Sequence, residues 1–339
     1  MTARRPPTDH AARRWIVPAL CLAAAGCFDV ELEQEPDWSS VLEQDEEDRG
    51  TYLIPWPVES VPELRIGITP YLGREQMEAD FAPLKEHLQH RIGIPVQMVV
   101  APDYAGLGRM LHGGEIDVGE FTPLSYVLTK LEYPDLQLLL REVSEGADTY
   151  VSYVYVRADD PAETLTALGG RSFCYVDPHS TSGYLYPRAL LWEHHIDPDR
   201  FFGRTVFAGD HVGCLHKVLD GEIDAAAIYS GAVAQARRED LPVFRLKVVA
   251  KTRRIPYGAY CARAGLPEAA RQRFRNELLQ LSERSPEGPR LIGRGAKINA
   301  WAPAEDQDYN PVRRAVYLTR MNAHASRPAA EPMTDAPQD

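Results

Sequence analysis

Between residues 64 and 140, short apolar runs alternate with segments whose apolar residues recur at the spacing of a helical face. Leu64–Ile68 and Val96–Val100 are typical of short buried strands. The segment between them predicts an amphipathic helix through Met77, Phe81, Leu84 and Leu88. A helix, a strand and a further helix follow, and Leu136–Leu140 forms the next strand. This β-α-β-α-β-α-β order predicts an α/β domain with helices on both faces of its sheet.

The second half of the chain repeats a sequence pattern of the first half. Tyr150–Val156 alternates aromatic and β-branched residues, which predicts a long strand. Gly-Glu-Ile-Asp occurs at 114–117 and again at 221–224, each time after an amphipathic helix and before an apolar strand. The shared context predicts two similar α/β lobes. Ligands favour domain interfaces and the carboxyl ends of strands, so we expect a ligand cleft between the lobes.

We expect the chain to divide into a leader, a tether, two lobes and a tail. The tail is rich in Ala, Pro and Glu, which disfavours a packed core. The predicted boundaries are a lipoprotein signal peptide at 1–26, an acidic tether at 27–60, lobe 1 at 61–153, lobe 2 at 154–250, a return to lobe 1 at 251–322 and a disordered tail at 323–339.

The first residues resemble an export signal. Four arginines precede an apolar run at 15–25, which is too short to span a bilayer because a spanning helix needs about 20 residues. Ala24-Ala25-Gly26-Cys27 then places small residues before a cysteine, the pattern of a lipoprotein signal whose Cys27 is lipidated after cleavage. Ala24 stands where a larger aliphatic residue is more usual. An ordinary cleaved signal and a chance apolar run are the alternatives.

Charge is concentrated beside this leader. The chain has a formal net charge of −12, and residues 28–50 hold ten acidic side chains against Arg49 alone. Such a run cannot bury a core and is expected to stay solvated as a tether. The remaining body is only mildly acidic and has no basic stripe, so nucleic-acid binding is not expected.

The cysteines permit a disulfide without selecting it. Beyond the leader, Cys174, Cys214 and Cys261 are widely spaced and odd in number. Their spacing matches no metal-binding pattern, so no metal or other cofactor is expected. An oxidising compartment permits one disulfide, and the sequence leaves its partners open.

The stretch 177–187 (Asp-Pro-His-Ser-Thr-Ser-Gly-Tyr-Leu-Tyr-Pro) is the main candidate for a binding site. A strand-like run leads into its Asp-Pro turn, and Ser180, Thr181 and Ser182 open a helical pattern. The first N–H groups of a helix lack partners and the helix dipole is positive there, so this turn suits an anion. Gly183 is expected to leave room for a ligand near the backbone. The alternative is an ordinary helix N-cap, for which Ser and Thr are common.

Tyr104 and His211 lie in two other predicted strand-to-helix turns, and Tyr150 opens the long strand. Hydroxyl groups, helix N-termini and an imidazole donate hydrogen bonds from fixed positions, which suits a tetrahedral oxyanion. The alternatives are packing for the two tyrosines and a surface or capping role for His211.

Catalytic motifs are missing from the sequence. It contains no Gly-x-Ser-x-Gly, no His-Glu-x-x-His and no phosphate-binding loop of the Walker kind. Asp177, His179 and Ser180 lie around a single turn, whereas a catalytic triad needs side chains that converge from separate elements. We therefore expect a binding protein rather than an enzyme.

These features together resemble the phosphate, phosphite and phosphonate substrate-binding proteins of ABC transporters. The resemblance runs from Leu64 to Met321 and implies a two-lobed α/β fold of the type II periplasmic-binding-protein class, often lipid-anchored. An ABC permease and its ATPase are the implied partners. The matching stretches are 101–106 (Ala-Pro-Asp-Tyr-Ala-Gly), 114–118, 123–126, 177–187, 208–211 (Ala-Gly-Asp-His) and 255–256.

The resemblance also implies the ligand-binding residues. In this family the phosphate or phosphonate group is held by a Ser-Thr pair, a histidine and tyrosines of both lobes. The corresponding residues of this chain are Ser180, Thr181, Ser182, His211, Tyr104 and Tyr150.

One departure from the family pattern concerns the amine of an aminoalkylphosphonate. Family members that bind such a ligand place acids near its ammonium group, and this chain has Gly231 and Gly258 at those positions. A buried ammonium without a carboxylate partner is costly. We therefore expect a ligand without an amine: phosphite, phosphate or a small alkylphosphonate.

Two other stretches also depart from the pattern. Glu120 and Thr122 stand where an aromatic residue and a glycine are usual. Thr122 is expected to add a hydroxyl to the site, whereas Glu120 either repels a dianion or points outward. Arg253 and Arg254 are unusual as well, and one of them is a candidate for the mouth of the cleft.

The sequence thus predicts a monomeric, lipid-anchored, extracytoplasmic solute-binding component of an ABC importer. One alternative keeps the fold and couples it to a signalling partner as a ligand sensor. A second is an extracytoplasmic phosphoesterase, and a third is a binder of another ligand, such as a sulfonate or a pyrimidine.

Overall fold

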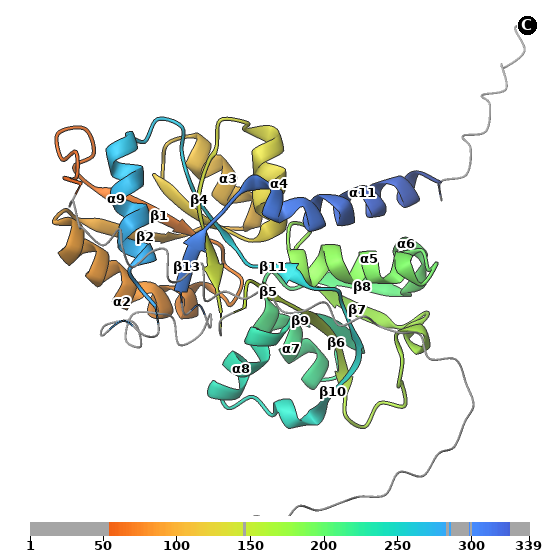
Figure 1. Ribbon diagram of the computed structural model, residues 1–339. Coiled ribbons are helices and arrows are strands. Elements are labelled where there is room, and N and C mark those ends of the chain that lie inside the picture. The colour runs from red at the N-terminus through yellow and green to blue at the C-terminus, as the bar shows by residue number, and fades with distance from the viewer. Residues whose placement is uncertain (1–53, 145–146, 283–284, 286–297, 299, 326–339) are drawn as a thin grey trace, which may run out of the picture. The chain divides into compact units, whose positions relative to one another are not determined.

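Two β-sheets joined by a short ribbon organise the computed structural model, which describes residues 54–144, 147–282, 285, 298 and 300–325 (Figure 1). The predicted signal peptide, the lipidation candidate Cys27 and most of the predicted tether and tail lie outside these residues. Among the described residues, no helix combines the length and apolar character needed to cross a membrane.

The first sheet is mixed. β1 pairs in parallel with β2 and β3, whereas β12 runs antiparallel between β3 and β4. Its strands, in spatial order, are β13 (Ala300–Pro303), β4 (Gln137–Val143), β12 (Ala259–Ala262), β3 (Val118–Phe121), β1 (Leu64–Ile68) and β2 (Val96–Val100). β12 and β13 come from the C-terminal part of the chain, so this sheet is assembled from distant segments.

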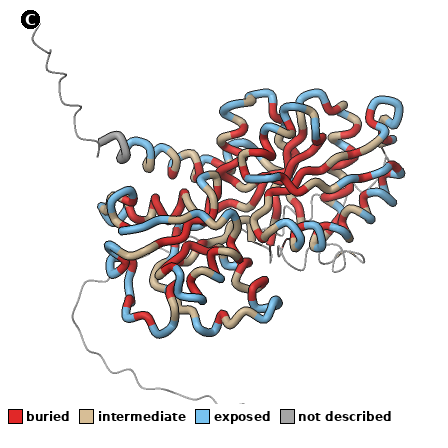
Figure 2. Tube along the Cα trace, turned by 180° about the vertical axis from the view of Figure 1, so that it is seen from behind, coloured by how far each residue is buried: buried red, intermediate tan, exposed pale blue. Residues whose placement is uncertain are grey.

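Helices cover both faces of the first sheet, as the β-α alternation predicted. The helices around it are α2 (Arg74–Ile92), α3 (Tyr104–His112), α4 (Pro123–Glu132), α9 (Glu268–Leu279) and α11 (Asn310–Ala325), the last entered through a 3₁₀ turn, η4 (Asp306–Tyr309). Met77 and Phe81 of α2 belong to one buried cluster, and Leu107 of α3 and Leu124 of α4 belong to another. Figure 2 shows the strands buried and the outer sides of the helices exposed.

The second sheet has five strands. β7 pairs in parallel with β8 and β9, and β6 is antiparallel to β9 and β10. In spatial order they are β10 (Leu246–Lys251), β6 (Ser152–Arg157), β9 (Ala225–Tyr229), β7 (Ser172–Tyr175) and β8 (Arg204–Phe207). The accompanying helices are η1 (Leu165–Leu168), α5 (Tyr186–Glu193), α6 (Pro198–Phe201), α7 (His211–Leu219), α8 (Ser230–Arg238) and η3 (Val243–Arg245).

A two-stranded ribbon, β5 (Thr149–Tyr150) with β11 (Ile255–Pro256), lies between the two sheets in the chain. The predicted single strand at 150–156 is therefore wrong: Tyr150 pairs with Ile255, whereas Ser152 pairs with Tyr229 in the second sheet. The strand breaks at Val151 because the backbone changes partners there. Periodicity alone could not reveal this, since both parts alternate in the same way.

α11 contacts elements beside both sheets. It packs against α4 of the first and against α5 of the second (Figure 1). Val312 and Ala315 of α11 share a buried cluster with Leu124 of α4 and Ala189 of α5. The C-terminal helix therefore stabilises the junction between the two halves.

The turn after β7 begins as a π-helix, η2 (Thr181–Leu185), rather than as an ordinary α-helix. The Leu185 N–H donates to the Ser180 carbonyl, five residues back, at 3.1 Å. A Cβ on Gly183 would lie 2.4 Å from Val176 Cγ2. The expected role of Gly183, room for a ligand, is thus corrected: glycine is required because the turn packs directly on the end of the strand.

Replacing this glycine tests the tight packing. Gly183→Ala should lower the free energy of unfolding by about 1–3 kcal/mol, because the added methyl group overpacks against Val176. Chemical denaturation followed by circular dichroism measures the change. Gly183→Val should cost more than Gly183→Ala, because the larger side chain meets Val176 Cβ as well as its Cγ2, and an unchanged stability for Gly183→Ala would contradict the packing account.

A disulfide joins Cys174 of β7 to Cys214 of α7, with 5.8 Å between their Cα atoms. Cys261 is buried and free. The sequence left the pairing open, and the sheet decides it because β7 and α7 meet on one face. The bond ties the strand that leads to Ser180 to the helix that begins at His211.

Loss of this bond should be visible in stability. For a sequence separation of 40 residues, the loop-entropy relation gives a stabilisation of about 4 kcal/mol. Cys174→Ser with Cys214→Ser should unfold at lower denaturant concentration than the oxidised protein. A reductant should shift the wild-type protein to the same midpoint and leave the variant unmoved. If the unfolding midpoint of the wild-type protein is the same with and without reductant, the bond adds no stability.

Candidate functional site

α3 and α7 begin in the same way. The carboxylates of Asp103 and Asp210 accept hydrogen bonds from the N–H groups of Gly106 at 2.6 Å and Gly213 at 2.7 Å. Each acid is an N-cap that satisfies an otherwise unpaired helix donor. The residue after each cap occupies the first helical position, and these residues are Tyr104 and His211.

The repeated Gly-Glu-Ile-Asp sequence belongs to the same structural repeat as these two capped helices. Asp117 accepts the backbone N–H of Arg65 at 3.0 Å, and Asp224 accepts that of Ser172 at 2.9 Å, so each acid holds the neighbouring parallel strand. Both acids follow the helix cap by the same number of residues, from 103 to 117 and from 210 to 224. The repeat therefore includes the two candidate binding residues, Tyr104 and His211, which occupy equivalent positions in it.

The three hydroxyl residues of the turn are buried. Ser180 Oγ accepts the Gly183 N–H at 3.0 Å, and Thr181 Oγ1 accepts the Leu124 N–H of α4 at 2.8 Å. Because each oxygen already accepts from the backbone, its O–H proton is left to donate. The turn therefore combines capping with hydroxyl donors, and the two readings of this stretch are not exclusive.

Ser182, His211 and Tyr150 converge from three elements. Ser182 Oγ lies 3.3 Å from His211 Nε2, and a hydrogen bond joins Ser182 to Tyr150. Tyr104 lies beside Ser180, in poor geometry for a hydrogen bond. The structure thus brings together the Ser, His and Tyr side chains singled out by sequence.

Several polar atoms in this group lack partners among the described residues: the Tyr104 hydroxyl, His211 Nδ1 and the Tyr229 hydroxyl are buried and make no hydrogen bond. Buried polar groups are normally satisfied, so such atoms point to a missing ligand or water. Burial lowers the pKa of His211 to about 3, so its ring is neutral near neutral pH. A neutral imidazole offers one N–H donor, and its other nitrogen accepts.

Thr122 has a local role in the structure. It caps α4, where its hydroxyl oxygen accepts the Ser125 N–H at 3.4 Å, and its hydroxyl lies 3.4 Å from the His179 carbonyl oxygen. The two arginines singled out by sequence are exposed: Arg253 pairs with Glu193 at 2.7 Å, and Arg254 Nη1 donates to Thr149 Oγ1 at 3.3 Å.

Two aromatic residues that the sequence reading missed complete the group. The Tyr71 carbonyl oxygen accepts the His211 N–H at 3.1 Å. The Tyr229 ring lies 4.9 Å from the His211 ring and 6.0 Å from the Tyr150 ring. The repeat could have identified Tyr229, because it follows Asp224 by the same interval as Thr122 follows Asp117.

Two buried acids also lie near this group. Glu120 does not point outward as one expectation had it: it is 2% exposed, and its Oε2 accepts the Thr69 N–H at 3.2 Å. Glu142, which the sequence reading missed, is 5% exposed. A Cβ at Gly258 would lie 2.7 Å from Glu142 Oε2 and 3.2 Å from Glu120 Oε1. The premise that no acid lies at the Gly258 position is therefore wrong, because two neighbouring strands supply carboxyl groups to it.

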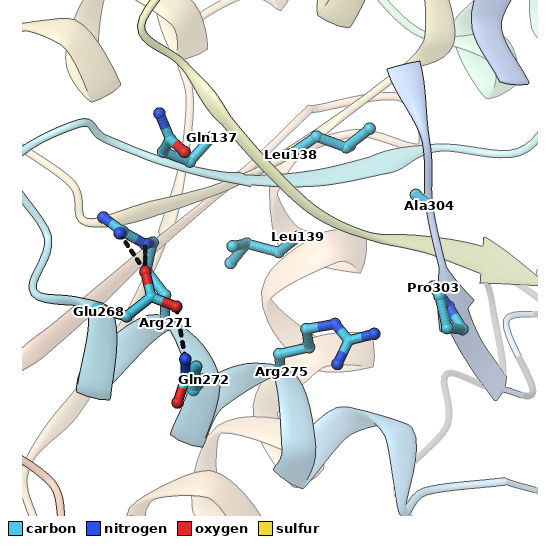
Figure 3. Close-up of a pocket in the computed structure, with 9 residues that line it drawn as sticks. All are labelled: Gln137, Leu138, Leu139, Glu268, Arg271, Gln272, Arg275, Pro303 and Ala304. Carbon is cyan, nitrogen blue, oxygen red and sulfur yellow. Dashed lines mark hydrogen bonds and ion pairs between the residues drawn. The ribbon is translucent and has the colours of Figure 1, made fainter. Parts of the chain in front are cut away.

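A separate pocket of about 250 Å³ lies over the first sheet (Figure 3). β4, α9 and the end of β13 line it, and Glu268 in its wall is already bound to Arg271 and Gln272. None of the candidate binding residues lines this pocket. Over the described residues, no group of three His, Cys, Asp or Glu side chains is arranged to hold a metal ion.

Known proteins are similar to this chain in sequence and in fold. The phosphate-import protein PhnD of Mycolicibacterium smegmatis is 29% identical over 280 residues, which cover 77% of this chain and 87% of that protein. A binding-protein component of an ABC phosphonate transporter from Pseudomonas aeruginosa matches with a TM-score of 0.71 at 20% identity, covering 78% of this chain and 89% of that one. PhnD1 from Prochlorococcus marinus, solved in complex with methylphosphonate, matches with a TM-score of 0.69 at 17% identity, covering 77% and 98%.

The expected α/β fold of the type II periplasmic binding proteins is confirmed by these structures. A family model described as the periplasmic substrate-binding protein of ABC phosphonate transporters matches residues 66–309. This chain therefore belongs to the periplasmic substrate-binding proteins of ABC phosphonate transporters.

Proposed function

We propose that this protein binds a small phosphorus oxyanion without an amine (phosphite, phosphate or a simple alkylphosphonate) and presents it to an ABC permease and its ATPase. The proposal rests mainly on one observation. Buried donors at the helix starts beside both sheets lie near unsatisfied polar atoms: the hydroxyls of Ser180, Thr181 and Ser182, the imidazole of His211 and the phenol of Tyr104. The methylphosphonate bound by PhnD1 of Prochlorococcus marinus supports the ligand class.

In this proposal the oxyanion sits among neutral donors. The O–H groups of Ser180 and Thr181 donate because their oxygens already accept backbone N–H groups. Hydrogen bonds to an ionised acceptor are about twice as strong as neutral ones, so several such donors replace the water that the anion loses on burial. Lipid anchoring through Cys27 would hold the monomeric receptor near its permease. Neither the anchor nor the binding step breaks a bond of the ligand.

Calorimetry tests the ligand class. Titration with phosphite, phosphate and methylphosphonate should give a dissociation constant well below about 1 mM for at least one of them. 2-Aminoethylphosphonate, the control, should bind at least about tenfold more weakly than the best of the three, since about 1.4 kcal/mol corresponds to that factor. Carboxyl groups do lie beside Gly258, but burial raises their pKa, and a protonated carboxyl group does not neutralise an ammonium group. Tighter binding of the aminoalkyl compound would refute the amine-free assignment, and no binding of any of the four would refute the phosphorus oxyanion itself.

Substitutions test the residues. Thr181→Ala and His211→Ala should each weaken binding about tenfold or more, because a hydrogen bond to a charged group contributes about 1.5–3 kcal/mol. Thr181→Ser keeps the hydroxyl and should retain most of the affinity. Thr164→Ala, which removes an exposed hydroxyl that pairs with the Thr166 hydroxyl, is the matched control. Unchanged affinity in both alanine variants, with circular dichroism showing a folded protein, would exclude these residues from the site.

A further inference from the structure

The two buried acids form a pair across one strand. Glu120 belongs to β3 and Glu142 to β4, and β12 hydrogen-bonds to both of these strands. Their side chains approach the same point, the position that a Cβ on Gly258 would occupy, to 3.2 Å and 2.7 Å. The absence of a side chain at residue 258 is therefore what leaves space for the two carboxyl groups.

The pair lacks a positive partner. No Lys or Arg of the described ranges forms a salt bridge with either carboxyl group, and Glu142 Oε1 makes no hydrogen bond there. The backbone N–H of Thr69 donates to Glu120. The other titratable groups that face the pair are phenols from four elements and the turn after β1: Tyr71, Tyr150, Tyr229, Tyr260 and Tyr309. Burial raises the pKa of Glu120 above the ordinary value of 4.5, and burial together with the nearby Glu120 carboxyl group raises that of Glu142.

Tyrosine side chains connect this pair to the proposed ligand site. Tyr150 hydrogen-bonds Ser182 on one side and interacts electrostatically with Glu142 on the other. Tyr229 interacts with Glu142 in the same way, and its ring packs on His211. The Tyr229 hydroxyl is buried and has no hydrogen-bond partner among the described residues, so it is free to bond a ligand or water.

The site therefore contains an electrostatic conflict. A phosphorus oxyanion would enter a buried region with a neutral imidazole and two acids, neither of which forms a salt bridge with a Lys or Arg in the described part of the chain. Two ionised carboxylates would oppose the bound anion, because repulsion is poorly screened inside a protein. The conflict disappears if the acids carry protons, since a carboxylic acid is uncharged and can donate a hydrogen bond.

We propose that Glu120 and Glu142 are specificity-determining residues that hold protons while the oxyanion is bound, so that ligand binding and protonation of this pair are linked. This inference rests on the proposed function and goes beyond it. The proton comes from solvent: when the free protein has lost one from the pair, binding takes one up, and no bond of the ligand changes. The site consequently selects against ligands at alkaline pH through its own acids, in addition to the titration of the ligand.

The direction in which stability changes with pH follows from the same protonation. The folded protein binds protons that the unfolded chain releases above about pH 4.5, the ordinary glutamate value. Without ligand, stability should therefore fall as the pH rises from that value into the alkaline range where the native pair finally ionises. Glu120→Gln with Glu142→Gln should remove this part of the slope.

The test compares the wild-type protein with the double variant Glu120→Gln/Glu142→Gln, using methylphosphonate as the probe. Calorimetric dissociation constants are measured between about pH 6 and pH 10, where the ligand's own titration is common to both proteins. At the alkaline end, the wild-type protein should lose about tenfold more affinity per pH unit than the variant for each proton linked to binding. Glu115→Gln, which removes an exposed acid from the same segment, should follow the wild-type curve.

Proton uptake gives a second measurement. Calorimetry at one alkaline pH in buffers of different ionisation enthalpy should show net uptake of protons by the wild-type protein beyond that expected from the ligand's own titration. The single variants Glu120→Gln and Glu142→Gln should each reduce this uptake, whereas Thr164→Ala should leave it unchanged. Parallel affinity curves for wild-type protein and double variant would overturn the inference and leave the ligand proposal intact. Net release of protons together with preferred binding of 2-aminoethylphosphonate would also overturn the inference, because the two carboxyl groups would then be ionised and would face an ammonium group. Absence of binding to any phosphorus oxyanion in the wild-type protein would instead refute the proposed function.

Discussion

The side-chain cap at the start of α3 and of α7 is the interaction on which the proposed site depends. Each capping aspartate fixes the first helical turn, and with it the direction of the residue that follows, Tyr104 or His211. At the other end of each repeat, Asp117 and Asp224 attach the next strand to its parallel neighbour. Loss of a cap costs about 1 kcal/mol in typical helices, but here it would also release a binding residue. In the proposed site, stability and recognition therefore both depend on these four acids.

Recognition in the proposed site rests on hydrogen-bond donors rather than on net positive charge. The hydroxyl turn donates O–H groups, and burial keeps His211 neutral by lowering its pKa. Neutral donors at fixed positions discriminate by geometry and by the protonation state of the ligand, whereas lysine or arginine would attract many anions alike. This distinction explains why two acids can lie near such a site without abolishing it.

Much of the architecture was predictable because it follows from local patterns. The apolar runs at 64–68 and 96–100 and the helical period of Met77 to Leu88 act within one element each, and the structure has these elements. The strand-to-helix turns at Tyr104, Ser180 and His211 were predictable for the same reason. Glu142 and Tyr71 were not, since their proximity to the site depends on how β12 aligns with β4 and on which loop meets α7. The break at Val151 and the π-turn at Thr181 were hidden because each depends on tertiary pairing rather than on composition.

The bond between Cys174 and Cys214 also determines when the protein can mature. Reducing systems in the cytosol keep thiols apart, so a cross-link of this kind forms in an oxidising compartment such as the periplasm. The strand that carries the hydroxyl turn and the helix that carries His211 are thus fastened to each other only after export. Maturation of the protein is thereby confined to the side of the membrane on which its family meets its ligands, and a chain retained in the cytosol would keep the two candidate binding segments unlinked.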